Sequence, residues 1–317
     1  MATSGNTNLR FNRNEVIRQA LLICRVATEG EEMQPEMITN GAIALNSIIK
    51  SWTAQGYHLW KLKEGTLFLE KGKYKYSLNP DGDNATNEYN ENMLKWCVPK
   101  GSNQIYLQFP NLPSIGEKIA FRLCDREFFW ANVTEILDDN GVVIDEFVPE
   151  CLEACSKVIY YTNKIIRPLK ILDARRVDSF GIELIMRNLE REQYNKLTDK
   201  TAIGTPVNYY YDPQLKNGFF YVWQAPADGR SMIKFTYEEE FEIFDTSKDE
   251  PDFPMEWFEA LTWNLAHKLC FHYGLPDNER DRIKIEAKET LTEAKRFDEE
   301  VGSVYIQPDL RSVRGAN

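Results

Sequence analysis

The spacing of the apolar residues changes twice along the chain, and this change limits the folds that it can adopt. Leu45, Ile49 and Trp52 recur every three or four residues, the period of one face of a helix. The same period returns after residue 254, whereas segments between about 66 and 238 alternate as β-strands do. Helices from both ends must therefore come together with β structure between them, which predicts an α+β fold with a helical bundle built from the two ends.

The N-terminal region is predicted to form two helices joined by a short turn. Asn14 is a reasonable N-cap for the first helix, and Gly30 is a plausible stop. The second helix begins near Pro35, because proline suits the first turn of a helix, and ends at Gly56. These two helices would form an antiparallel pair.

The C-terminal third predicts two more helices and a tail. The first helix begins near Pro254 and is apolar on most of its circumference, which indicates burial on several sides or packing between subunits. The expected packing residues of the helices are Trp52, Trp257, Leu261, Trp263 and Leu265. The second helix begins at Asp277 and has one apolar and one charged face. Residues 301–317 have no helical period and are expected to form an extended tail.

The central β structure is predicted to comprise a hairpin, an inserted module and an antiparallel region. The hairpin spans 66–78 and turns at Lys71-Gly72-Lys73. Closely spaced strands between 84 and 165 predict a small sandwich or barrel, with a tight turn over 138–141. The module strands are expected at 105–109, 118–123, 128–136, 142–144 and 157–162. Residues 12–83 and 166–300 would then form the remaining core, with a short helix near 189–194.

Composition and charge exclude several classes of protein. Seven Trp, fifteen Tyr and seventeen Phe among 317 residues are ample core material, so the chain is not wholly disordered. No apolar run is long enough for a membrane helix, and no N-terminal signal peptide is expected. The 49 acidic residues against 38 basic ones give a net charge of -11. This balance disfavours a surface that grips nucleic acid, although DNA could still pass without being held.

The sequence contains no motif of a nucleotide-dependent or metal-dependent enzyme, and we expect no cofactor. G-x-x-x-x-G-K-[ST], G-x-G-x-x-G and G-x-S-x-G do not occur. His267 and Cys270 could face the same way on a helix, but packed residues are the favoured interpretation because an isolated pair rarely completes a metal site. The six cysteines form no C-x-x-C pair, so reduced thiols are expected.

Acidic residues offer weak candidates for chemistry or for a surface. Glu88 and Glu91 could form a sugar-cleaving pair, as could Asp125, Glu127 and Asp145. Their spacing does not distinguish them from ordinary solvated acids, which is the preferred interpretation. The stretch from 238 to 259 is the most acidic of the chain and begins with Glu238, Glu239, Glu240 and Glu242. A solvated loop and a surface that repels DNA explain this stretch about equally well.

Five segments in order resemble the head-to-tail adaptor, or tail accessory factor, family of tailed bacteriophages, especially the short-tailed ones. The first runs from EVIRQALLICRVATEG to the pattern of Leu45, Asn46, Ser51, Trp52 and Gly56. The others are TLFLEKGKYKYSLNPDGD, then RPLKILDARR, then REQYNKLTDKTAIGTP with YYYDPQLKNGFFYVWQAP, and finally DFPMEWFEALTWNLAHKL with SVYIQPD. Shorter family members pass almost directly from the second segment to the third, so residues 84–165 are an insertion resembling that of longer members.

The resemblance implies a structural protein rather than an enzyme. About twelve copies would form a ring under the portal protein, extend the DNA channel and carry the tail hub or nozzle protein. The location would be the portal vertex of the virion, after synthesis in the host cytoplasm, and double-stranded DNA would pass through without sequence-specific binding. The C-terminal tail would dock on the portal through Val304, Tyr305, Ile306, Leu310, Arg311 and Arg314.

Two other functions remain open on the sequence. A virion-associated cell-wall hydrolase would use acids of the inserted module, and a glycan- or receptor-binding module would use residues 84–165 on a helical base. Assembly with the portal, cleavage of peptidoglycan and glycan binding distinguish the three.

Overall fold

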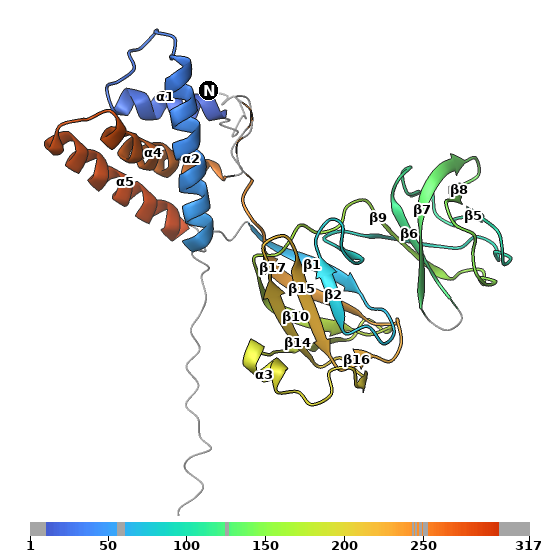
Figure 1. Ribbon diagram of the computed structural model, residues 1–317. Coiled ribbons are helices and arrows are strands. Elements are labelled where there is room, and N and C mark those ends of the chain that lie inside the picture. The colour runs from blue at the N-terminus through green and yellow to red at the C-terminus, as the bar shows by residue number, and fades with distance from the viewer. Residues whose placement is uncertain are drawn as a thin grey trace, which may run out of the picture. The chain divides into compact units, whose positions relative to one another are not determined.

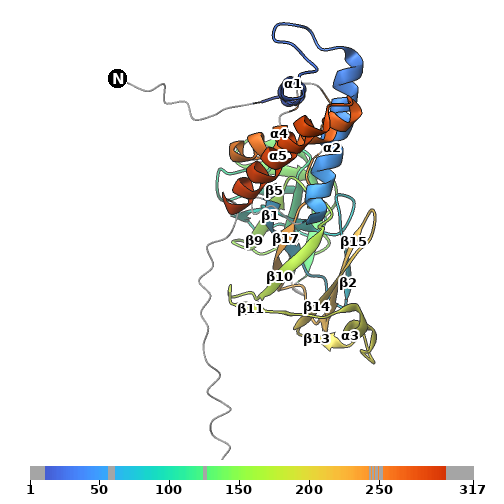
Figure 2. The same ribbon diagram turned by 90° about the vertical axis from the view of Figure 1, so that its left-hand side faces the viewer.

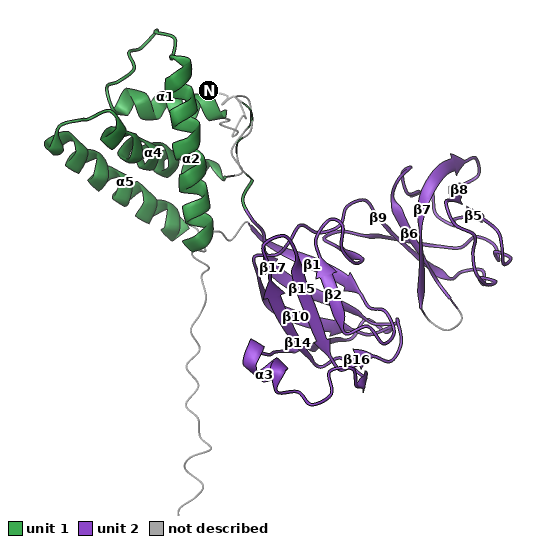
Figure 3. Cartoon of the chain, in the orientation of Figure 1, with its two compact units in different colours: residues 1–59, 241–317 green, residues 60–240 purple. Residues whose placement is uncertain are grey.

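The computed structural model describes residues 11–55, 61–123, 127–242, 244, 246, 249 and 253–297. The fold is mixed α+β (Figure 1), and the chain divides into two compact units (Figure 3). Residues 1–59 and 241–317 form the helical unit, and residues 60–240 form the β unit. Within the described residues, no helix is both long and apolar enough to cross a membrane.

The helical unit draws its helices from both ends of the chain (Figure 2). They are α1 (Arg13–Ile23), α2 (Pro35–Gln55), a 3-10 turn η2 (Met255–Trp257), α4 (Phe258–His272) and α5 (Asp277–Phe297). Helix α4 packs against α1, α2 and α5, so it has apolar residues on several sides. Of the two explanations that the sequence left open for this helix, burial on several sides within one chain accounts for its pattern.

The limits of α1 differ from those predicted. The N-cap is Asn12 rather than Asn14: the side chain of Asn12 accepts a hydrogen bond from the Glu15 amide at 2.9 Å, and the Glu15 carboxylate accepts one from the Asn12 amide at 2.8 Å. This reciprocal capping box requires Glu three residues after the cap, a condition that only Asn12 meets. The helix ends at Ile23, well before Gly30.

Two sheets of the β unit form a sandwich around one core. The first sheet has the order β11 (Glu183–Ile185), β10 (Lys170–Val177), β17 (Met232–Glu238), β1 (Leu62–Phe68) and β3 (Ala85–Thr86). The second has the order β12 (Arg187–Asn188), β14 (Asn208–Pro213), β15 (Gly218–Trp223) and β2 (Lys75–Leu78). Beside them lie α3 (Arg191–Asn195) and a small pair, β13 (Ile203–Gly204) with β16 (Ala225–Pro226). Side chains from both sheets, including Leu67, Tyr76, Phe220 and Phe235, fill the sandwich core.

The predicted hairpin over 66–78 is wrong. Strand β1 pairs with β17 and β3, whereas β2 pairs with β15 in the opposite sheet. The segment is an arch between the two sheets, because Leu67 of β1 and Leu78 of β2 both enter the core that the sheets enclose. Burial of every residue from 65 to 69 marks β1 as a strand covered on both faces, which alternation alone does not reveal.

The remaining sheet is a curved, barrel-like layer of six antiparallel strands. Its order is β4 (Asn90–Met93), β9 (Lys157–Tyr161), β6 (Lys118–Arg122), β7 (Phe128–Leu137), β8 (Gly141–Ile144) and β5 (Gln104–Tyr106). A bridge between Leu94 and Leu107 joins residues that follow the two edge strands, so the sheet curls back toward itself. The predicted tight turn between β7 and β8 is confirmed, with positive φ of 62° at both Asp139 and Asn140.

The barrel-like sheet packs onto the sandwich through a second face of β1. Phe68 is 1% exposed and lies among the rings of Trp130 and Tyr161 from the barrel-like sheet, at centroid distances of 5.1 and 6.4 Å. Ile159 and Met232 belong to the same cluster. Strand β1 is therefore shared by two apolar clusters, one on each face.

Candidate functional site

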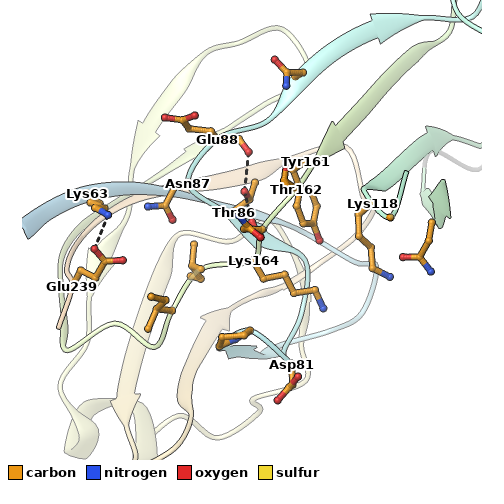
Figure 4. Close-up of a pocket in the computed structure, with 17 residues that line it drawn as sticks. Lys63, Asp81, Thr86, Asn87, Glu88, Lys118, Tyr161, Thr162, Lys164 and Glu239 are labelled. Atoms are coloured by element: carbon orange, nitrogen blue, oxygen red, sulfur yellow. Dashed lines mark hydrogen bonds and ion pairs between the residues drawn. The ribbon is translucent and has the colours of Figure 1, made fainter. Parts of the chain in front are cut away.

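A polar cleft of about 970 Å³ lies in the β unit, where the sandwich meets the barrel-like sheet (Figure 4). Hydroxyl and amide side chains form part of its lining, among them Thr86, Asn87 and Thr162, and charged side chains form another part. Figure 4 shows Lys118 and Lys164 on the same side of this cleft. The side chains offer hydrogen bonds and positive charge to a ligand.

The charged side chains around the cleft are partly paired with one another or with the backbone. The Lys63 amino group lies 2.6 Å from the Glu239 carboxylate, so these two charges neutralise each other. Lys164 donates to the Gly82 carbonyl, and partial burial together with the nearby charge of Lys118 lowers the pKa of its amino group. The lining residues do not include a cysteine, a serine or a histidine that could act as a nucleophile or its base.

The acids considered for sugar cleavage differ in their surroundings. Glu88 and Glu91 are both exposed, and the Glu91 carboxylate forms an ion pair with Lys157 at 2.5 Å. Asp145 accepts hydrogen bonds from the backbone and side chain of Asn132. Although partial burial opposes the effect, these bonds lower the pKa of Asp145, so it is a poor proton donor. Asp125 lies outside the described residues, and the Glu127 carbonyl accepts a bond from the Leu123 amide.

Histidine and cysteine do not assemble a metal site in the described part of the chain, where no cluster of three metal-ligating side chains occurs. Cys270 donates to the carbonyl of His267 at 2.9 Å, a local contact within α4. The Cys24 thiol is buried and donates to the Ala266 carbonyl at 3.3 Å. Burial, with a smaller contribution from Cys270, raises the pKa of Cys24 to about 12, so the reactive thiolate is not available near neutral pH.

The expected packing residues lie in the helical unit. Trp52 is 5% exposed, and its ring lies 5.5 Å from that of Trp257, which is fully buried. Leu261 and Leu265 are also fully buried, whereas Trp263 is half-buried. Contacts of these residues between subunits stay a prediction.

Asn46 has a role that its place in the family-like motif did not reveal. Its side-chain amide donates to the Phe244 carbonyl and accepts from the Phe244 amide, both at 3.1 Å. These paired bonds fix the segment near residue 244 to helix α2, so the side chain acts as a clamp within the helical unit.

The four acids expected to face a channel differ in their surroundings. Glu239 is 6% exposed and pairs with Lys61 and Lys63 at 3.7 and 2.6 Å, so its charge is internal to the β unit. Glu238 and Glu240 are half-buried, and Glu242 is exposed. Alternation along β17 continues to Glu239 and turns this residue inward, which corrects the expectation of an acidic surface at that position.

An apolar strand edge is the surface feature that sequence reasoning missed. Strand β11 is the terminal strand of its sheet and carries bulky side chains that remain exposed. The exposed fractions are 88% for Phe180, 57% for Ile182, 49% for Leu184 and 86% for Ile185. We call these four residues the β11 edge. The signal was the apolar segment FGIELIM, which matches neither a hairpin nor a helix.

The residues expected to dock on the portal lie outside the described residues: Val304, Tyr305, Ile306, Leu310, Arg311 and Arg314. Their role stays a prediction.

Comparisons with known proteins add little to this geometry. No family model matches the chain, and no curated protein matches it. Among solved structures, the chain is similar to VP17, a capsid protein of bacteriophage P23-77, at 8% sequence identity over 60% of this chain and 77% of that one. The TM-score is 0.12, which is too low to support an inference about fold or function.

Proposed function

We propose that this protein is a structural subunit of a tailed-phage virion, a head-to-tail adaptor that acts without catalysis. About twelve copies would form a ring that binds the portal protein on one side and the tail hub or nozzle protein on the other. The ring would continue the DNA channel at the portal vertex and let DNA leave during genome ejection. The order of the family-like segments motivates this proposal.

The β11 edge is the observation that carries the proposal. Natural proteins usually protect the edge strands of their sheets, because an open edge pairs readily with another chain. Here the edge strand is exposed and apolar, with Phe180 and Ile185 more than 80% exposed. A ring of identical subunits needs such a surface for its neighbour, and a free monomer gains nothing from it.

Net charge and the helical unit also support an adaptor. A charge of -11 would keep DNA from adhering to a channel wall. In the finer arrangement that we propose, the four helices form a bundle at the portal side, and Glu238, Glu240 and Glu242 contribute to the acidic lining. The C-terminal tail would order against portal subunits.

Assembly with the portal tests the proposal. Full-length protein would be mixed with portal rings of the same phage and analysed by size-exclusion chromatography with light scattering and by electron microscopy. We expect added density of ring symmetry on the portal. Ile185→Glu should abolish this assembly and leave the fold intact. Leu215→Glu, at a site 91% exposed in the loop between β14 and β15, should leave the assembly unchanged. A wild-type protein that stays monomeric beside portal rings would contradict the proposal.

The polar cleft favours glycan or receptor binding as the second candidate function. Its amide and hydroxyl lining suits hydrogen bonding to sugars. Glycan-array binding by the full chain that is lost in Lys118→Ala, together with failure to bind the portal, would favour this alternative.

A further inference from the structure

A second pocket, of about 330 Å³, lies beside the second sheet of the sandwich, between α3 and strands β2, β14 and β15. Tyr209 and Phe220 fill the sandwich core on the inner face of this sheet. Because side chains alternate along a strand, Tyr210 and Tyr221 lie on the outer face. Tyr194 of α3 joins them there, so residues distant in the sequence form one aromatic wall.

The aromatic wall is a tight cluster in which each ring contacts the other two. Ring centroids of Tyr194 lie 5.3 Å from Tyr210 and 5.1 Å from Tyr221, and those of Tyr210 and Tyr221 lie 5.6 Å apart. A sugar or a base needs a free ring face for stacking. The three rings pack against one another, which leaves less ring surface for stacking with such a ligand.

Three cations surround the cluster and complete its coverage. The Lys75 amino group lies 5.6 Å from the ring centroid of Tyr221, and that of Lys200 lies 5.4 Å from that of Tyr194. Neither lysine forms an ion pair with any residue that the structure describes. Arg191 pairs with Asp212, which leaves two positive charges without a carboxylate partner at the mouth of the pocket.

One buried polar group in the pocket wall also lacks a partner. Tyr194 is 5% exposed, and its hydroxyl forms no hydrogen bond within the described chain. A buried hydroxyl without a hydrogen-bond acceptor destabilises the folded state. Burial, with smaller contributions from Tyr221 and Tyr74, raises the pKa of Tyr194 to about 12, so the group stays protonated and can donate.

We propose that this pocket binds a carboxylate side chain presented by an acidic peptide segment of a partner protein. Lys75 and Lys200 would supply charge, and Tyr194 would donate a hydrogen bond after a small side-chain adjustment. The volume suits one side chain. The site does not depend on the adaptor function, because any acidic partner could occupy it.

Calorimetric titration of the full chain with a capped hexaglutamate peptide tests the site. We expect binding that weakens with added salt. The double variant Lys75→Gln/Lys200→Gln should bind at least about tenfold more weakly, since two charge-assisted contacts are lost. Lys216→Gln is the matched control, because Lys216 is an exposed lysine of the loop between β14 and β15 and lies outside the pocket. It should bind as the wild type does.

Tyr194→Phe separates binding from folding. We expect severalfold weaker binding together with a melting temperature that does not fall, because the hydroxyl has no partner to lose. Equal affinity of wild type and the double lysine variant would overturn the proposal. So would tighter binding of a hexanucleotide than of the peptide, which would identify the ligand as nucleic acid.

Discussion

The helical unit and the β unit build their cores in different ways. In the helical unit, the central helix α4 packs against α1, α2 and α5, and the apolar residues of these helices recur with a period of about 3.6 residues. In the β unit, strand β1 contributes Leu67 to the sandwich core and Phe68 to the cluster beneath the barrel-like sheet. The helices enclose one core, whereas strand β1 belongs to two cores of the β unit. A destabilising substitution in β1 should therefore affect more of the structure than one in any single helix.

Removal of the barrel-like sheet should have the largest effect. We expect deletion of 88–163, closed by a short Gly-Ser link, to leave the helical unit folded but to destabilise the β unit. The deletion exposes Phe68, Val177 and Met232 to solvent, and the burial of each such side chain stabilises the fold by about 1.5–3 kcal/mol. Hydrogen exchange measured by mass spectrometry would show faster exchange in β1 and β17 and unchanged exchange in α4.

The ends of this deletion are suited to a short link. The Ile165 amide donates to the Ala85 carbonyl at 3.0 Å, and the Thr86 hydroxyl donates to the Asn163 carbonyl at 2.8 Å. The predicted insertion limit of 84 would also have removed β3, which pairs with β1. Loss of cooperative unfolding in the helical unit as well would show that the two units do not fold independently.

Single aromatic truncations in each unit sharpen the comparison. Phe68→Ala and Trp52→Ala should each cost about 3–5 kcal/mol, because both side chains are at most 5% exposed. Their effects should be localised differently: Phe68→Ala should loosen both the sandwich and the barrel-like sheet, and Trp52→Ala only the helices around Trp257. Chemical denaturation gives the cost, and hydrogen exchange gives the location. A Trp52→Ala cost below about 1 kcal/mol would contradict its burial.

The same difference explains what the sequence could and could not predict. Helix α2 begins at Pro35 as predicted, and strands such as β6 and β9 lie within a residue of their predicted limits, because period and turn residues are local signals. Pairing is not local. The arch between β1 and β2 was predicted as a hairpin because a short turn joins two alternating segments. Their longest pairings, with β17 and β15, involve residues more than 100 positions further along the chain.

Site prediction failed for a related reason. Lys75, Tyr194 and Tyr221 are separated by long stretches of sequence, so the sequence did not indicate that cations and aromatic rings gather in one pocket. The acids around residue 240 were visible as a run of negative charge. The burial of Glu239, however, depends on strand alternation and on its ion pairs with Lys61 and Lys63.

The Glu239 ion pair should give an intermediate effect. Glu239→Gln removes the charge that faces Lys61, whose side chain is only 5% exposed, and we expect a loss of about 2–3 kcal/mol. Glu242→Gln, at an exposed position just beyond the β unit, should change the free energy of unfolding by less than about 0.5 kcal/mol. Equal small effects in urea denaturation would show that Glu239 is solvated and available to a channel.

The smallest effect should come from the cap of α1, where sequence and structure disagree on a single residue. Asn12→Ala removes a side chain that accepts from the Glu15 amide, and breaks the capping box, so we expect a loss of about 1 kcal/mol. Asn14 lies inside the helix and its side-chain oxygen forms no hydrogen bond within the described residues. Asn14→Ala should therefore be neutral or slightly stabilising, since alanine is the better helix former. Thermal unfolding of the two variants identifies the N-cap residue. A larger loss of stability in Asn14→Ala than in Asn12→Ala would show that Asn14 is the N-cap, as the sequence first indicated.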